Sequence, residues 1–227
     1  MSKDNESLPR PSGLLTKYFP FEPTSGQSAF FSKMDYFLLM EPEKKPTFVL
    51  RGYAGTGKTS VISALVKVLP KLSMRSLLLA PTGRAAKVMS NYSGRAAYTI
   101  HKIIYKPKAE DGSLGGGFIL QKNYYKDTVF IIDESSMLAD DGGMSGNLLG
   151  DLISFVFYGQ NNRLLLVGDT AQLPPVGSEF SPALEADYLL RHFRLEADYI
   201  ELTEVMRQRL ESGILFNATN LRHQLQL

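Results

Sequence analysis

The stretch Gly52-Tyr53-Ala54-Gly55-Thr56-Gly57-Lys58-Thr59 decides the fold of this chain of 227 residues. It follows an apolar run at 47–50 and opens an amphipathic segment at 58–69, which is the strand–loop–helix context of a phosphate-binding loop. Its glycines let backbone N–H groups turn toward a phosphate, and the N-terminus of the helix adds partial positive charge. We expect Lys58 to reach the phosphates and the Thr59 hydroxyl to bind Mg²⁺. The predicted nucleotide contacts are Gly52, Ala54, Gly55, Thr56, Gly57, Lys58, Thr59 and Ser60.

Four further apolar runs resemble the one before this loop. They lie at 76–80, 128–132, 163–167 and 199–202. Because they are nearly continuous rather than alternating, they are typical of strands buried on both faces of a parallel sheet. Helical segments are expected at 27–39, 58–69, 83–90, 148–158 and 182–190. This alternation predicts an α/β fold with a mostly parallel central sheet of five or more strands, flanked by helices.

Three segments depart from this alternation. Residues 1–20 are expected to be a flexible leader, so that the main domain spans 21–227. Residues 107–127 are rich in Gly, Lys and Asp, which predicts a small inserted hairpin. Residues 212–227 favour a helix without a stop signal, as at the end of a piece of a longer chain.

Composition excludes some classes of protein. The absence of Cys excludes disulfides and thiolate metal sites. No apolar run approaches the roughly 18 residues of a membrane span, and no signal core follows the N-terminus, so we expect a cytoplasmic protein with no membrane partner.

The basic residues are unevenly distributed along the chain. Net charge is only +2, but six basic residues and no acidic one lie in the stretch from Arg84 to Lys108. Such a stretch is either a phosphate-binding surface or a solvated helix face, and charge alone does not decide between them.

Two adjacent acids supply what a phosphate loop needs in addition. Asp133 and Glu134 follow an apolar run, which carries them to the carboxyl edge of the sheet, where ligands bind in open α/β folds. Asp133, at the end of a neighbouring strand, is predicted to hold Mg²⁺ directly or through water. Glu134 points elsewhere and is predicted to polarise the attacking water. The pattern therefore indicates an enzyme that binds and hydrolyses a nucleotide, with ATP and Mg²⁺ as the expected cofactors.

Further motifs resemble superfamily 1 helicases of the RecD and Dda-like group. The matching segments are 80–86 (motif Ia), 99–101 (a short DNA-contacting motif), 133–137 (motif II), 167–177 (motif III) and 202–208 (motif IV). Their order and spacing also agree with the group from about Gln27 to the end. The resemblance implies an ATP-dependent DNA helicase with a RecA-like motor domain, which moves along single-stranded DNA with 5′ to 3′ polarity.

The resemblance also assigns roles to single residues. Gln27 stands where the group reads adenine, Gln172 where it senses the γ-phosphate, and Arg207 where an arginine finger approaches it. The predicted catalytic residues are thus Lys58, Asp133, Glu134, Gln172 and Arg207. DNA contacts are implied for Pro81, Thr82, Arg84, Thr99, His101 and Lys102, which lie in or beside the basic stretch. Such contacts position a strand without reading its sequence.

The resemblance is incomplete in two places. Glu179 occupies a position where the group usually has Gly, which affects the local turn. Motifs V and VI are not in these residues, which implies that the second RecA-like domain is missing.

The resemblance also implies a partner and a role for the insert. A repair or recombination complex is a further expected partner. The insert lies where the group carries a duplex-splitting hairpin, with Phe118 or Tyr124 as candidates for its apolar tip. Two alternatives stay open: a non-catalytic ATP-dependent module that binds single-stranded DNA, and a small-molecule kinase.

Overall fold

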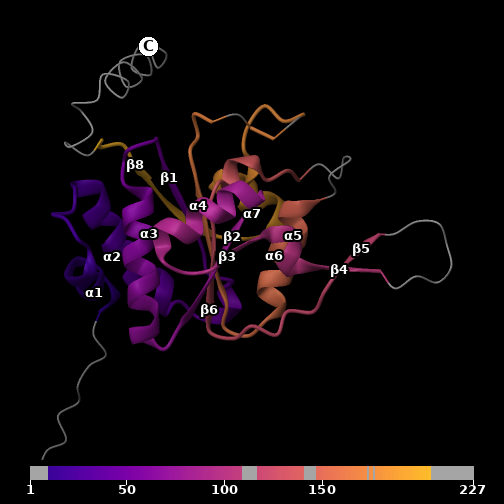
Figure 1. Cartoon of the computed structure of the whole chain (residues 1–227), viewed down its shortest axis with the longest axis horizontal. Helices are drawn as coiled ribbons and strands as arrows, with labels where there is room; N and C mark the ends of the chain where they lie inside the picture. Colours follow the sequence, from indigo (N-terminus) through magenta and orange to yellow (C-terminus); the bar gives the residue numbers. More distant parts are fainter. Residues whose placement is uncertain (1–9, 109–116, 141–146, 173, 176, 206–227) are drawn as a thin grey trace, which may run out of the picture.

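A six-stranded parallel sheet forms the centre of the molecule (Figure 1). The computed structural model describes residues 10–108, 117–140, 147–172, 174–175 and 177–205. The strand order is β3-β2-β6-β7-β1-β8. The strands are β1 (Thr47–Gly52), β2 (Arg75–Ala80), β3 (Ala97–Thr99), β6 (Thr128–Ile132), β7 (Arg163–Gly168) and β8 (Ala197–Leu202). All five predicted strands are present, and the short edge strand β3 is additional.

Helices cover both faces of this sheet (Figure 1). The first face carries α1 (Pro11–Tyr18), α2 (Ser25–Leu39), α3 (Lys58–Val68) and α4 (Gly83–Ser93). The second carries α5 (Ile100–Ile104), α6 (Leu148–Tyr158) and α7 (Ala186–Phe193). Side chains of β6 alternate between the two cores, with Val129 in the first and Phe130 in the second. Both faces are therefore buried, which explains the continuous apolar runs.

Short 3₁₀ helices connect several of these elements. They are η1 (Pro42–Lys44), η2 (Leu69–Leu72), η3 (Ser135–Met137) and η4 (Pro182–Leu184). The single helix predicted at 182–190 is wrong, because Glu185 has an extended backbone that separates η4 from α7. The helix predicted at 212–227 lies outside the described residues. Among those described, no helix combines the length and apolar character needed to cross a membrane.

The prediction of a flexible leader is wrong for residues 11–18, which form α1. Leu15 has no exposed surface and belongs to the core shared with α2 and α3. The backbone N–H and the hydroxyl of Ser12 both donate to the Asp35 carboxylate, at 2.7 Å each. These contacts are made to residues distant in sequence, so an eight-residue segment gives little local sign of them.

The predicted insert does contain a hairpin, which protrudes from the domain (Figure 1). Its antiparallel strands are β4 (Tyr105–Pro107) and β5 (Phe118–Leu120), and the Lys108 N–H donates to the Gly117 carbonyl at 2.8 Å. The hairpin thus begins two residues before the predicted boundary. Residues 121–127 return along the domain, where the buried Asn123 side chain donates to the Phe155 carbonyl at 2.8 Å. Tyr124 belongs to this return segment, so its assignment to the tip is wrong.

Candidate active site

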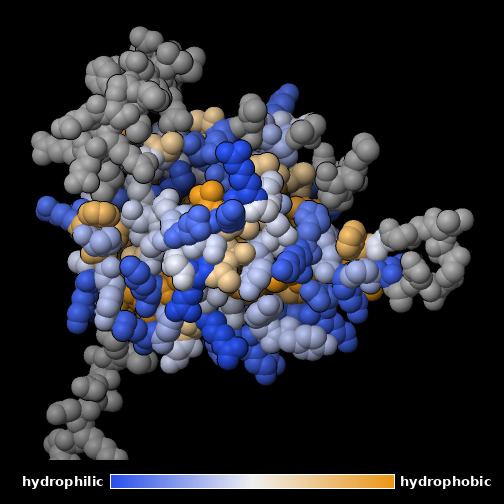
Figure 2. Space-filling model, in the orientation of Figure 1, coloured by the Kyte–Doolittle hydropathy of each residue, from blue (hydrophilic) through white to orange (hydrophobic). Residues whose placement is uncertain are grey.

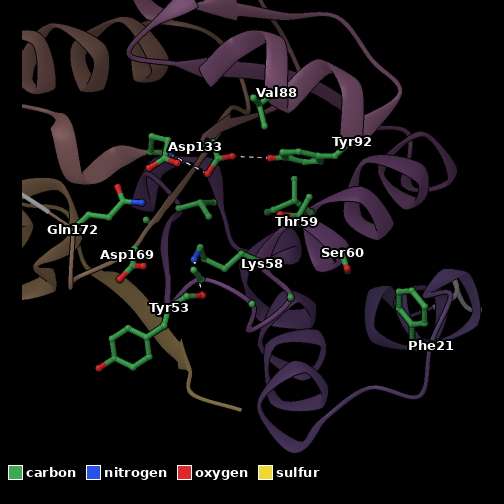
Figure 3. A pocket seen from close by; sticks show the side chains of 17 residues that line it. Phe21, Tyr53, Lys58, Thr59, Ser60, Val88, Tyr92, Asp133, Asp169 and Gln172 are labelled. Carbon is green, nitrogen blue, oxygen red and sulfur yellow. Dashed lines mark hydrogen bonds between the residues drawn. The ribbon is translucent and has the colours of Figure 1, made fainter. Parts of the chain in front are cut away.

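The carboxyl ends of β1, β6 and β7 meet at one cavity of about 460 Å³ (Figure 3). This volume lies in the range of small-molecule sites. The predicted site residues that line it are Ala54, Gly55, Gly57, Lys58, Thr59, Ser60, Asp133, Glu134 and Gln172. Three motifs that are far apart in sequence are therefore brought together at one edge of the sheet.

The phosphate loop leaves no space for side chains at its turns. Gly55 and Gly57 both have φ of 89°, a conformation that L side chains rarely adopt. A Cβ at Gly52 would lie 2.7 Å from the Thr56 hydroxyl oxygen and 3.0 Å from the Leu202 carbonyl oxygen. The Lys58 ammonium donates to the carbonyls of Gly52 and Tyr53. The loop therefore has the compact form that aims backbone N–H groups at a phosphate.

Gln27 lies beneath this loop rather than in the cavity wall. Its side chain is fully buried and does not line the cavity. The amide oxygen accepts from the Thr24 N–H at 3.1 Å, which caps α2, and the amide nitrogen donates to the Thr56 carbonyl at 3.1 Å. The Glu204 carboxylate also caps α2 by accepting from Ser25. Gln27 thus supports the phosphate loop, and its role as an adenine reader stays a prediction.

Asp133 reaches the cavity from β6, but β6 is not the direct neighbour of β1. Strand β7 lies between them, so the expectation of an adjacent strand is wrong. One Asp133 carboxylate oxygen accepts from the Glu134 N–H at 3.0 Å, and the other accepts from the Tyr92 hydroxyl at 2.8 Å. Burial, followed by the Asp133 charge, raises the pKa of Tyr92 well above its usual range. The phenol thus remains a donor to the carboxylate.

Glu134 is held in an unusual backbone conformation beside Asp133. Its φ of 55° and ψ of 37° are left-handed, which for a non-glycine residue is uncommon outside turns and functional sites. Burial and then the negative charge of Asp133 raise the pKa of Glu134. A hydrogen bond from Gln172 and the Lys58 charge oppose this shift. A raised pKa makes the carboxylate a better proton acceptor for water near neutral pH.

Several cavity residues were missed by the sequence reasoning. Asp169 is 2% exposed and follows β7 as Asp133 follows β6, which is a signal that could have found it. Phe21, Tyr53, Val88 and Tyr92 also line the cavity (Figure 3), and Phe21 lies at the end away from Gln172. Tyr53 lies within the phosphate loop, at a position where the pattern accepts any residue, and the other three come from a loop and a helix face outside the matched motifs.

The donor set fits a nucleotide bound with Mg²⁺. The Thr59 hydroxyl and the carboxylates of Asp133 and Asp169 line the cavity, and hard oxygen ligands of this kind suit Mg²⁺. Lys58 supplies positive charge at the loop that would receive the phosphates. Arg207, the predicted arginine finger, lies outside the described residues.

The predicted DNA contacts lie at the same edge of the sheet. Ala80 of β2 pairs with Thr99 of β3, so the residues after both strands emerge side by side. The Thr82 hydroxyl caps α4 by accepting from the Ala85 N–H, and the Thr99 hydroxyl caps α5 by accepting from the Lys102 N–H. Each hydroxyl keeps its proton as a donor for a phosphate. Pro81 is half-buried beside them, and Arg84, His101 and Lys102 are exposed.

A second cavity joins this surface to the nucleotide cavity. Thr82, Arg84 and Ala85 line it, together with Val88, Asp133, Glu134 and Gln172, which also line the first. The basic stretch is not one surface, however. Arg95 follows the C-terminal end of α4, about 16 Å from its N-terminal end by helix geometry, and Lys106 lies on the hairpin. Figure 2 accordingly shows hydrophilic residues spread over the face that α4 crosses.

Comparison with known proteins identifies the family to which this chain belongs. The family described as AAA domain matches residues 42–224. The ATP-dependent RecD2 DNA helicase of Deinococcus radiodurans is 34% identical over 179 residues, which cover 77% of this chain and 21% of that protein. The ATP-dependent DNA helicase dda of Enterobacteria phage T4 is 29% identical, over 80% of this chain and 39% of its own length. The chain thus spans well under half the length of these relatives.

Two solved structures share the fold. The Pif1 helicase from Bacteroides, in complex with ADP-AlF3 and single-stranded DNA, has a TM-score of 0.54 at 18% identity and covers 91% of this chain and 47% of its own. The Pif1 helicase from Candida albicans has a TM-score of 0.55 at 21% identity, over 89% and 44%. At these identities the likeness supports the RecA-like fold.

Proposed function

The chain belongs to the AAA domain family and has a RecA-like fold of the superfamily 1 helicase type, and we propose that it is the ATP-binding motor domain of a DNA helicase. In this proposal ATP hydrolysis drives movement along single-stranded DNA. The polarity that we propose is 5′ to 3′, on the resemblance to the RecD and Dda-like group. We also propose a cytoplasmic location, a second RecA-like domain in the parent protein and a role in a repair or recombination complex.

The proposal rests on one observation, which is that the cavity at the phosphate loop and the cavity at Thr82 and Arg84 are lined partly by the same residues. Asp133, Glu134 and Gln172 face both the phosphate loop and the cavity of Thr82 and Arg84. A nucleotide and a DNA backbone bound on either side of these residues would each change the charge that the other meets. Neither a kinase nor a passive DNA-binding module needs this arrangement.

The proposed chemistry follows from the charges in the first cavity. Lys58 would balance charge on the β- and γ-phosphates, and Thr59 and Asp133 would hold Mg²⁺. When bound, Mg²⁺ neutralises charge that develops on the phosphate oxygens. Glu134, whose pKa is raised, would accept a proton from the attacking water.

Gln172 is the proposed link between the nucleotide and the DNA. Its amide oxygen accepts from the Ser136 hydroxyl at 3.3 Å, and its side chain hydrogen-bonds to Glu134. A γ-phosphate that forms a hydrogen bond with the Gln172 amide would therefore change the contacts of Gln172 with Ser136 and Glu134 of motif II. Arg84, His101 and Lys102 would contact DNA phosphates, so binding should weaken as salt rises.

The test measures phosphate release and DNA binding by the same protein. We expect Mg²⁺-dependent ATP binding, weak phosphate release that oligothymidine stimulates, and oligothymidine binding that falls with salt. Arg84→Ala combined with Lys102→Ala should weaken DNA binding about tenfold and flatten its salt dependence. Arg95→Ala removes a basic residue of the same stretch at the far end of α4 and should have little effect.

Three results would contradict the proposal. Release no faster than that of Asp133→Ala would support the passive module, and phosphate transfer to a nucleoside would support the kinase. An effect of Arg95→Ala equal to that of the double variant would show that the basic stretch acts only through net charge.

A further inference from the structure

Tyr92 contacts the metal-site carboxylate from an element that carries no catalytic motif. It lies in the last turn of α4, and its hydroxyl donates to Asp133 Oδ2 at 2.8 Å (Figure 3). The other carboxylate oxygen, Oδ1, accepts from the Glu134 backbone N–H at 3.0 Å. Both oxygens of Asp133 are therefore fixed, one by its own loop and one by a separate helix.

The phenol is itself held in place by the helix of the phosphate loop. The Ser63 hydroxyl of α3 donates to the Tyr92 carbonyl at 3.0 Å, and the Tyr92 ring packs against the core that α3 and α4 share. Because α3 begins at Lys58, the position of the phenol is tied to the loop that would receive the phosphates. The hydrogen bond thus fixes the Asp133 carboxylate relative to that loop.

An aspartate that binds a metal benefits from such a partner. The side chain has two rotatable bonds, and a carboxylate free to rotate would have to be ordered when the metal binds. Each carboxylate oxygen has two lone pairs, so Oδ2 can accept from Tyr92 and still face a metal or a metal-bound water. Hydrogen bonds to ligand side chains commonly raise metal affinity in this way.

We propose that Tyr92 is a positioning residue, whose hydroxyl orients the Asp133 carboxylate for Mg²⁺ bound with a nucleotide. This role rests on the proposed function of the same cavity. It predicts that the hydroxyl affects the metal dependence of nucleotide binding and leaves metal-free binding unchanged. A role in packing alone would depend on the ring and would be independent of Mg²⁺.

The experiment measures binding of a fluorescent ADP analogue across a Mg²⁺ titration and, separately, in EDTA. Tyr92→Phe keeps the ring and removes the hydroxyl. We expect it to need about tenfold more Mg²⁺ for half-maximal enhancement of binding. Affinity in EDTA should equal that of the wild type. In an Asp133→Asn background the Tyr92→Phe change should have no further effect on the Mg²⁺ dependence, since the carboxylate that it orients is gone.

Ser63→Ala is the matched control. It removes the hydrogen bond from α3 to the Tyr92 carbonyl, while the packing of the ring against the core keeps the phenol beside Asp133, so it should keep the Mg²⁺ dependence of the wild type. Equal Mg²⁺ dependence in Tyr92→Phe and wild type would overturn the role of Tyr92 alone. An equal loss in Ser63→Ala would assign the effect to helix packing and also overturn it. If binding of the ADP analogue to the wild type is independent of Mg²⁺, the proposed function and this role are both overturned.

Discussion

We call the carboxyl edge of the central sheet, which lines the proposed nucleotide cavity, the nucleotide edge. This edge and the β4–β5 hairpin differ in how their side chains contact the rest of the molecule. At the edge, side chains from different elements bond to one another, as Tyr92 does to Asp133 and Ser136 to Gln172. In the hairpin, β4 and β5 pair with each other and form a sheet separate from the central one. Phe118 is 72% exposed, and Figure 2 shows apolar side chains at this protrusion. A change at the edge should therefore alter several groups at once, and a change in the hairpin few.

The largest expected effect separates chemistry from binding at the edge. Glu134→Gln keeps the size of the side chain but removes the proton acceptor, so phosphate release should fall by about 10²–10⁴-fold. ATP affinity should stay within a fewfold of the wild type, because the phosphate loop is unchanged. Rapid-quench measurement of hydrolysis and calorimetry of binding test this together. Undiminished hydrolysis would show that Glu134 does not activate water.

A second variant contrasts the two regions in nucleotide binding. Lys58→Ala removes an ammonium that would bond to phosphates, and ATP affinity should fall about 100-fold. Phe118→Ser, on the hairpin, should leave that affinity unchanged. Titration with a fluorescent nucleotide measures both. If Phe118→Ser also weakens nucleotide binding, the two regions are not independent.

Residues 121–127, the return segment of the insert, differ from the hairpin because they contact the main domain. Asn123 is 4% exposed and donates to the carbonyls of Phe155 and Val156 at the end of α6. Asn123→Ala should lower the free energy of unfolding by about 1–3 kcal/mol, because it leaves these buried carbonyls with fewer donors. Urea unfolding measures this loss. Ser32→Ala, which removes an exposed hydroxyl bond to the Ser28 carbonyl within α2, is the control and should cost less.

The smallest expected effect is a dependence of stability on pH. Because the pKa of Glu134 is raised in the folded state, the folded protein binds this proton more readily than the unfolded chain. The free energy of unfolding of the wild type therefore falls as the pH rises from the pKa of Glu134 in the unfolded chain to its higher pKa in the folded protein. Glu134→Gln lacks this titration, so its Tm should exceed that of the wild type by about 1–2 °C at neutral pH. The difference should vanish below the unfolded pKa; a constant difference in scanning calorimetry would contradict this cause.

The same contrast explains what the sequence could predict. Strand β6 and helix α6 were predicted to the residue, because long apolar patterns and complete motifs reflect burial within one element. The convergence of Lys58, Asp133 and Gln172 follows from a parallel sheet, whose strands end at a common edge. The family motifs thus located most of the cavity, although the roles assigned to its residues stay predictions.

What the sequence could not predict depends on contacts between elements. Strand β3 has three residues and exists through its pairing with β2. Helix α1 depends on Leu15 entering a core formed mainly by other segments. Tyr92 ends a helix whose local pattern does not show that a carboxylate lies beside it. Each case needs the tertiary fold, which periodicity and motif spacing do not contain.

The backbone bond between Lys108 and Gly117 has a practical consequence for labelling. It joins the two described ends of the hairpin, so chain added between these residues lengthens a connection whose ends are already held together. Doubling the length of such a loop costs only about 0.6 kcal/mol. A short peptide tag or a dye-bearing cysteine could therefore be inserted there, in a chain with no cysteine of its own. A single fluorophore would then report on the protrusion while the nucleotide edge keeps its native sequence.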